Sequence, residues 1–146
     1  MKRRQFIVLT GSTFVLAACG QAAQAKATLE VYKQSTCGCC KVWAEYMEDH
    51  GYIVNVHNVS DVAPMKREYG VPKALESCHT TRVGGYTVEG HVPAEVVDRL
   101  LAEQPSISGI ALPQMPAGSP GMPGKKQGKW TVYEIRNGRR VVFTRI

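Results

Sequence analysis

The sequence lacks two features that would place it in large functional classes. No apolar run is long enough for a confident membrane-spanning helix, and no basic stripe carries interleaved aromatic residues. The second absence argues against nucleic acid as a partner. With 146 residues, the chain has room for one compact domain and too little for two comfortable ones. Its formal net charge of +6 falls to +3 when residues 1–18 are set aside, because they hold three basic residues and no acidic one.

Residues 1–18 have the layout of an export signal, with a basic start, a short apolar run and small residues at the end. "KRRQFI" resembles a twin-arginine signal with Lys in place of the usual Ser or Thr. "LAAC" resembles a lipobox in which Cys19 is lipidated; an ordinary secretory signal, with Cys19 discarded, is the alternative. We therefore expect residues 19–27 to form a lipid-anchored linker and residues 28–146 to form a periplasmic domain that contacts the membrane only through this anchor.

The pattern of apolar residues and turn signals predicts an α/β domain. It indicates strands over 28–33 and 52–59, helices over 39–50, 61–69 and 93–103, and a β-hairpin around Gly84-Gly85. This order, β-α-β-α-β-β-α, is that of the thioredoxin fold. Residues 111–124, half of them Pro or Gly, are expected to form an added loop with no helix or central strand. Asn137-Gly138 predicts a further C-terminal β-hairpin.

Three of the mature cysteines lie together in "STCGCCKVW", residues 35–43. The predicted topology places Cys37 at the start of the first helix, where exposed N–H groups and the helix dipole favour a thiolate. A thiolate is both the nucleophile of disulfide exchange and a metal ligand. The placement alone therefore leaves open whether Cys37 and Cys40 form a redox pair or whether the "CGCC" cluster binds a metal.

The same topology brings Cys78 and three histidines, His57, His79 and His91, towards "CGCC". His79 and His91 are candidate ligands, although capping or orienting the local turns would also account for them, and His57 alone reads better as a solvated residue. Met115 and Met122 in the Pro/Gly-rich loop offer thioethers, or they pack the loop. Such soft donors favour Cu(I), with Zn(II) as the rival. A structural zinc site usually has two separated Cys or Cys/His pairs, which this spacing matches poorly.

Four stretches together resemble the CopG-like family of periplasmic copper-resistance proteins, long catalogued as a domain of unknown function. They are "STCGCCKVWAEYM", "GVPKALESCHT", "GGYTVEGHVPAEVVDRLL" and "GIALPQMPAGSPGMPG". The resemblance covers roughly residues 28–143. It implies a thioredoxin-like fold that binds Cu(I) through Cys37, Cys39, Cys40 and Cys78, and it leaves a redox role in copper handling open.

Two functions follow as competing hypotheses. The first is a Cu(I)-binding protein that sequesters or passes on copper, with a Cys37–Cys40 or Cys39–Cys78 disulfide coupled to the copper oxidation state. Its expected partners are copper ions and copper-efflux or copper-chaperone proteins. The second is a thiol-disulfide oxidoreductase with Cys37 as nucleophile and Cys40 as resolving thiol. A structural zinc module ranks last, and enzymatic turnover stays open.

Overall fold

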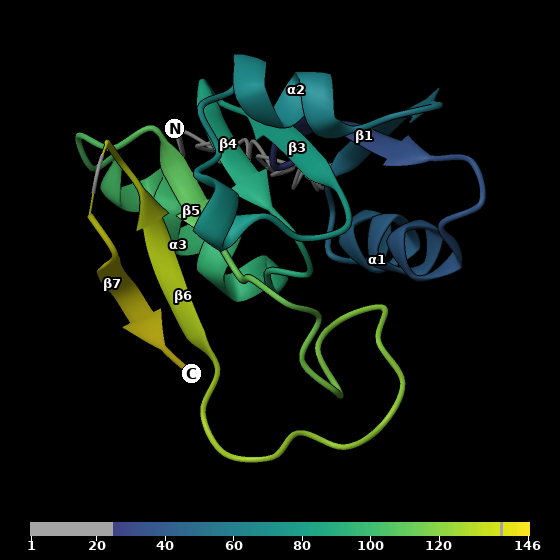
Figure 1. Cartoon of the computed structure of the whole chain (residues 1–146). Helices are drawn as coiled ribbons and strands as arrows, with labels where there is room; N and C mark the ends of the chain where they lie inside the picture. Colours follow the sequence, from purple (N-terminus) through teal and green to yellow (C-terminus); the bar gives the residue numbers. More distant parts are fainter. Residues whose placement is uncertain (1–24, 138) are drawn as a thin grey trace, which may run out of the picture.

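The structure, a computed structural model, describes residues 25–137 and 139–146. These residues contain seven strands and three α-helices (Figure 1). The predicted export signal and Cys19 lie outside them. The helices are α1 (Gly38–Asp49), α2 (Ala63–Glu68) and α3 (Ala94–Glu103), and a single 3-10 turn covers Lys73–Leu75. The strands are β1 (Thr28–Gln34), β2 (Ile53–Val59), β3 (Thr80–Val83), β4 (Tyr86–Glu89), β5 (Gly109–Ala111), β6 (Thr131–Ile135) and β7 (Val141–Arg145).

All seven strands belong to one sheet with the order β2-β1-β3-β4-β5-β6-β7. β1 and β2 run parallel, joined by α1, and β3 pairs antiparallel with β1. The β3–β4 hairpin turns at Gly84-Gly85, whose φ angles of 52° and 87° suit a primed turn. β5 lies parallel to β4, and the β6–β7 hairpin extends the sheet from β5.

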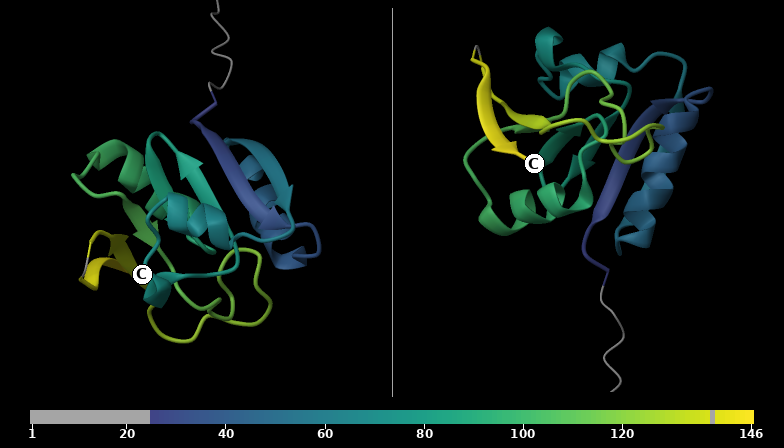
Figure 2. Two further views of the ribbon diagram at one scale, coloured as in Figure 1. Left: turned by 45° about the horizontal axis from the view of Figure 1, so that its top comes forward. Right: turned by 90° about the horizontal axis from the view of Figure 1, so that it is seen from below.

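The helices cover both faces of the sheet, with α1 and α3 on one side and α2 on the other (Figure 2). The larger apolar cluster lies under α1 and α3, where Trp43 and Met47 are fully buried against strand residues such as Val31. β5 shows the two faces directly: Ile110 belongs to this cluster, while Ala111 belongs to a smaller one on the opposite face. A strand buried on both faces reads as continuously apolar, so its pattern carries no period-2 signal.

The predicted order β-α-β-α-β-β-α is present from β1 to α3, and the C-terminal hairpin is present as β6 and β7. The prediction that residues 111–124 hold no central strand is wrong at their first residue, because Ala111 ends β5 in the middle of the sheet. The connection from β5 to β6 therefore begins at residue 112, and we call residues 112–130 the Pro/Gly/Met loop. No helix among the described residues has the length and apolar character needed to cross a membrane.

Candidate metal centre

β1 and α1 place the cysteine cluster at one end of the sheet. A turn after β1, closed by the Cys37 N–H donating to the Gln34 carbonyl oxygen at 3.0 Å, brings Cys37 to the N-cap of α1. Cys40, one turn into the helix, is fully buried, whereas Cys37 is half-buried. The two form a disulfide with their Cα atoms 5.4 Å apart. The predicted position of Cys37 at the helix start is confirmed.

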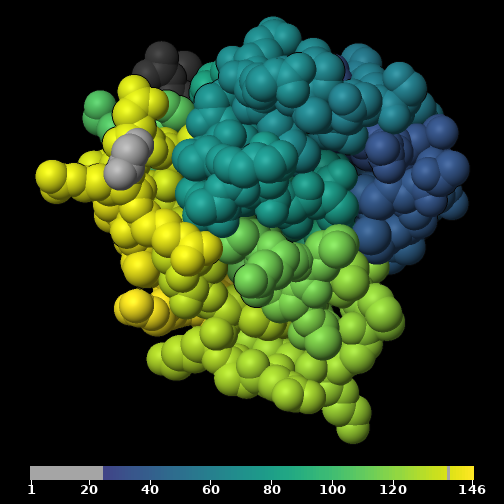
Figure 3. All heavy atoms as spheres, viewed as in Figure 1, coloured from purple at the N-terminus to yellow at the C-terminus, as the bar shows by residue number. Residues whose placement is uncertain are grey.

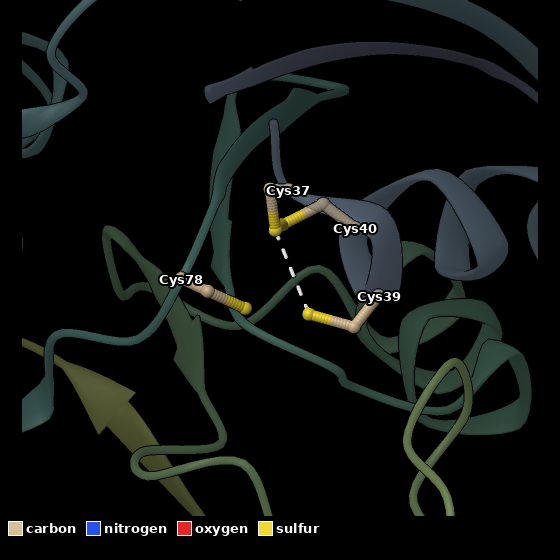
Figure 4. Close-up of side chains that lie close together, drawn as sticks. All are labelled: Cys37, Cys39, Cys40 and Cys78. Carbon is tan, nitrogen blue, oxygen red and sulfur yellow. Dashed lines mark hydrogen bonds between the residues drawn. A yellow bond between two sulfur atoms is a disulfide. The ribbon is translucent and has the colours of Figure 1, made fainter. Parts of the chain in front are cut away.

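The sulfur atoms of all four predicted cysteine ligands lie within 4.8 Å of one another (Figure 4). Cys39 comes from the first turn of α1, and its sulfur is 3.5 Å from that of Cys37. Cys78 lies just before β3 and points towards the same point from the other side. Cys39 and Cys78 are free thiols beside the Cys37–Cys40 disulfide. Four sulfurs this close can share a bound ion or bridge several.

A second group of candidate ligands adjoins the first at Cys78. It contains Cys78, His79 and His91, again with ligand atoms within 4.8 Å of one another. His91 Nδ1 is 2.7 Å from the carbonyl oxygen of Pro120, which can only accept, so Nδ1 carries a proton. In the neutral imidazole Nε2 is then an acceptor, and the Cys78 thiol, 2.8 Å away, donates to it. A metal ion that replaced this single proton would gain a thiolate and an imidazole together.

The pKa directions agree with this S–H···N arrangement. Burial raises the pKa of the Cys78 thiol to about 12, and the neighbouring Cys39 thiol adds to the shift. Burial also lowers the pKa of His91, against the opposing effect of its hydrogen bond to Pro120. Both shifts favour the neutral forms of the pair. A metal cation that binds here is therefore expected to displace this proton, which is released to solvent.

His79 is the least accessible candidate ligand. It is fully buried, its ring centroid lies 4.5 Å from that of Trp43, and it meets the His91 ring edge to face. Burial holds its pKa well below the usual value, so the ring is neutral at neutral pH. Its Nε2 has no hydrogen-bond partner among the described residues. An orphaned nitrogen acceptor or donor in such a position is costly, which fits a group kept for a ligand.

The Pro/Gly/Met loop closes one side of the centre. At its Gly121, a Cβ atom would lie 2.6 Å from the Cys39 carbonyl oxygen, 2.9 Å from the Trp43 nitrogen and 3.1 Å from His91 Nδ1. The residue also has a φ of +85°. Only glycine fits this contact, because both the space and the backbone conformation exclude a side chain. The loop thus rests directly on the first turn of α1 and on His91.

Replacing Gly121 with Ala is expected to destabilise the protein by about 1–3 kcal/mol more than the same change at Gly128. Gly128, in the same loop, has a similar φ of +69° but nothing within 4 Å of its Cβ position. The backbone strain is therefore similar in the two variants, and the difference between their free energies of unfolding measures the steric conflict with α1 and His91. Urea unfolding of the two variants measures it, and equal stabilities would contradict the loop placement.

A buried polar network, which sequence reasoning missed, supports the Cys78 segment. Glu89 of β4 is fully buried and accepts hydrogen bonds from the Ser77 N–H at 2.6 Å, from the Thr80 hydroxyl at 2.7 Å and from Lys66 Nζ. Lys66 of α2 is 6% exposed. Cys78 lies between two residues of this network and is held by it. The available signal was Glu89, an acidic residue at the end of an otherwise uncharged strand.

On the side away from the loop, the sulfur cluster borders an open cleft. Cys37 and Cys78 line it together with α2 and the segment before it, and its volume is ≈ 290 Å³. Lys66, Asp61 and Glu76 contribute polar groups to its wall. Cys37 is thus the sulfur of the disulfide that faces solvent, and Cys40 is shielded behind it. A thiol or a metal ion can approach the cluster through this cleft.

Three residues that the sequence brought into question, His57, Met115 and Met122, belong to neither group of candidate ligands. His57 lies on the exposed edge strand β2, stacked on Tyr32 and paired with Glu30, so the expectation that it converges on "CGCC" is wrong. Met115 is 46% exposed. Met122 is half-buried and follows Gly121, beside Cys39. A ligand role for either methionine stays a prediction, as does the assignment of each cysteine and histidine.

The raised pKa of Cys78 predicts slow alkylation of its thiol. With a pKa of about 12 against an ordinary 9.0, its thiolate fraction at pH 8 is lower by about a thousandfold. The more basic thiolate is intrinsically more nucleophilic, which recovers only part of this factor. We expect iodoacetamide to modify Cys78 at least about thirtyfold more slowly than an unstructured cysteine peptide, as followed by mass spectrometry of the disulfide-containing protein.

The pH dependence of the alkylation rate distinguishes a raised pKa of Cys78 from steric shielding of its thiol. The Cys78 rate should keep rising about tenfold per pH unit from pH 8 to pH 11, whereas that of the peptide levels off above its own pKa. A rate for Cys78 that levels off with the peptide would contradict the shift.

Three comparisons with known proteins bear on this arrangement. The family described as "Protein of unknown function, DUF411" matches residues 75–122, which include Cys78, His79 and His91. A comparison with curated proteins finds no match. Among solved structures, "Copper resistance protein copG- Form 2" is 38% identical, with a TM-score of 0.75, and the match covers 82% of this chain and 98% of that one. Form 1 matches with a TM-score of 0.74 and 38% identity, over 82% of this chain and 96% of that one.

Both matches have 38% identity and cover nearly the whole of the solved chains. The resemblance noted from the sequence motifs is therefore confirmed. This chain belongs to the CopG family of copper resistance proteins.

Proposed function

We propose that this chain is an exported, thioredoxin-like protein of copper resistance that binds Cu(I) through Cys37, Cys39, Cys40 and Cys78. It sequesters the ion, transfers it, or couples it to thiol oxidation. The convergence of four sulfurs within 4.8 Å carries the proposal. The related structures, both named as copper resistance proteins, support copper as the metal. Periplasmic location and lipid anchoring through Cys19 are part of the same proposal.

The donor set suits Cu(I) better than Zn(II). Thiolate is a soft ligand that Cu(I) prefers, and closely spaced thiolates can bridge several Cu(I) ions. Structural zinc instead takes four ligands in one closed tetrahedron, usually from two separated pairs. Here His79 and His91 adjoin the four sulfurs as further candidate ligands, so the site offers more donor atoms than a single tetrahedral ion uses.

The Cys37–Cys40 disulfide links copper binding to redox state. While it exists, only Cys39 and Cys78 offer thiols, and its reduction by two electrons and two protons provides the other two. In the opposite direction, formation of the disulfide from two thiols releases two electrons and two protons. Those two electrons match the reduction of two Cu(II) ions to Cu(I). The site can thus couple the reduction of two Cu(II) ions to the oxidation of two of its thiols with a closed electron balance.

A competitive copper titration tests the proposal. The protein is reduced anaerobically, and its Cu(I) binding is measured against a chromogenic chelator, beside the same protein with the Cys37–Cys40 disulfide left intact. We expect the reduced protein to retain Cu(I) against the chelator and the oxidised protein to retain less. Failure of the reduced protein to retain any Cu(I) would reject the function. Partner copper-efflux or copper-chaperone proteins would load or unload this site.

A thiol-disulfide oxidoreductase is the second candidate, favoured by the disulfide at the α1 N-cap and by the open cleft at Cys37. Cys37 would attack a substrate disulfide and Cys40 would resolve the mixed disulfide. This function predicts insulin-reducing turnover that is lost in Cys37→Ser and retained in Cys78→Ser. Copper binding without such turnover would support the first function and reject the second.

A further inference from the structure

The charge of this protein is divided unevenly along the chain. Residues 28–124 hold eleven acidic residues and seven Lys or Arg, while residues 125–146 hold seven Lys or Arg and a single acidic residue, Glu134. The total charge conceals this division because the two parts offset each other. The domain body is therefore acidic, and the end of the loop with the β6–β7 hairpin is strongly basic. Such an arrangement orients an approaching charged partner.

Most of the basic side chains of residues 125–146 have no acidic partner among the described residues. Glu134 pairs with Arg136. The other six form no ion pair with any residue that the structure describes: Lys125, Lys126, Lys129, Arg139, Arg140 and Arg145. Two of them lie over aromatic rings instead, with Lys126 Nζ 4.4 Å from the Trp130 ring centroid and Arg140 Cζ 4.9 Å from that of Tyr133.

Three of these cations, Lys129, Arg139 and Arg140, line two adjoining hollows, which we call the basic groove. The larger, of ≈ 320 Å³, lies between residues 112–116 and β6 and is lined by Lys129, Trp130, Tyr133 and Arg140. The smaller, of ≈ 170 Å³, lies between Arg139, Arg140 and the 3-10 turn. Arg140 lines both, so the hollows meet at its side chain. Figure 3 shows the yellow hairpin and the yellow-green loop side by side along this face.

The shape and chemistry of the groove favour a polypeptide over a lipid surface. A membrane-binding surface needs exposed apolar side chains to enter the bilayer. The large apolar side chains that are exposed in the described part are Val42, Ile53, Val56 and Met115, and none of them belongs to residues 125–146. The aromatic rings here instead form the walls of a concave site beneath cations. Concave walls with apolar faces and a few charged groups are suited to side chains of an extended segment.

We propose that the basic groove binds an acidic, extended segment of a partner protein. Carboxylates of the segment pair with Lys129 and Arg140, and its apolar residues lie against Trp130, Tyr133 and the prolines of residues 112–116. The loop that forms one wall also reaches His91 and Cys39 through Pro120 and Gly121. A partner in the groove would therefore contact the same loop that packs on the metal centre. The role of such a partner in copper exchange rests on the proposed function, but its binding does not.

A peptide-binding measurement without copper tests the proposal. The mature protein with Cys19→Ser is titrated into a fluorescent peptide of about twelve residues that alternates glutamate with proline, at low ionic strength. We expect saturable binding that weakens as salt is raised and that is absent for the peptide with glutamine in place of glutamate. The double variant Lys129→Glu/Arg140→Glu should bind at least about tenfold more weakly.

A matched control separates the groove from net charge alone. Lys41→Glu/Arg67→Glu makes the same change in charge on the body of the domain and should leave binding within about twofold of the unchanged protein. Equal losses in both double variants, or no peptide binding at all, would overturn the proposal. So would tighter binding of vesicles rich in phosphatidylglycerol, or of single-stranded DNA, than of the acidic peptide. None of these outcomes depends on whether the protein binds copper.

Discussion

Replacing Cys39 with Ser is expected to lower the Cu(I) affinity of the reduced protein by at least about a hundredfold. Loss of a group that merely orients a metal ligand typically costs 10–100-fold in affinity, so loss of the proposed ligand Cys39 itself should cost at least as much. Cys39 is the informative residue because a simple CxxC redox pair does not use it. Its sulfur lies 3.5 Å from that of Cys37, within the four-sulfur cluster. The competitive titration against a chromogenic chelator gives the affinity directly.

Two controls make this result specific. In protein made without the lipid, Cys19→Ser removes a thiol that is not among the proposed ligands and should leave Cu(I) affinity unchanged, which excludes a general effect of thiol number. Cys39→Ser should also keep the unfolding midpoint of the metal-free protein close to that of the unchanged chain, because Cys39 is only half-buried. Unaltered affinity in Cys39→Ser would mean that "CGCC" acts as a redox pair with a spare cysteine. The oxidoreductase function would then be favoured.

The position of the cysteines could be predicted because local sequence determines it. A strand followed by a helix puts Cys37 at the N-cap, and the cysteines at 39 and 40 follow in the first turn. Cys78 and His79 were placed by a second rule, since β3 begins directly after them and pairs with β1. The donors that meet at one sheet end were thus predictable from strand order alone.

Other features depend on long-range contacts that no local pattern records. β5 has three residues and is buried on both faces, so it resembles a short apolar linker. The interpretation of His57 as a solvated residue is confirmed, but its predicted convergence on "CGCC" was wrong, because its ring pairs with the exposed carboxylate of Glu30 at the outer edge of the sheet. The basic groove was missed because its cations offset an acidic body in the net charge. The two charges are already separated along the sequence, but only the fold brings residues 112–116, the 3-10 turn and β6 together as a groove.

Replacing Lys66 with Met is expected to destabilise the protein by about 3–5 kcal/mol at pH 8, a large share of the stability of a small domain. Lys66 is the cation beside the fully buried carboxylate of Glu89. Without it, the charge of Glu89 stays buried with only the hydrogen bonds from Ser77 and Thr80. Urea unfolding measures the loss. Lys41→Met, which breaks a highly exposed pair with Glu45, serves as the control and should have little effect.

The destabilisation of Lys66→Met should shrink as the pH falls. Burial raises the pKa of Glu89, while Lys66 opposes this shift, so removing Lys66 raises the pKa further. A carboxyl whose pKa is higher in the folded state than in the unfolded state binds its proton preferentially in the folded protein. Stability therefore increases as pH falls through the folded pKa, and the difference from the unchanged protein should be smaller at pH 5 than at pH 8.

Adding Glu89→Gln to Lys66→Met tests the same cause without a pH change. The amide oxygen of Gln still accepts from the Ser77 N–H, but the buried charge is gone, so the double variant should be more stable than Lys66→Met alone at pH 8. A double variant no more stable than the single one would contradict the electrostatic origin of the loss. Because Ser77 and Thr80 flank Cys78 and His79, the recovered stability should be accompanied by recovered Cu(I) affinity. The hydrogen bonds of residue 89 to Ser77 and Thr80, and not the charge of the ion pair, would then be what holds the second half of the metal centre against α1.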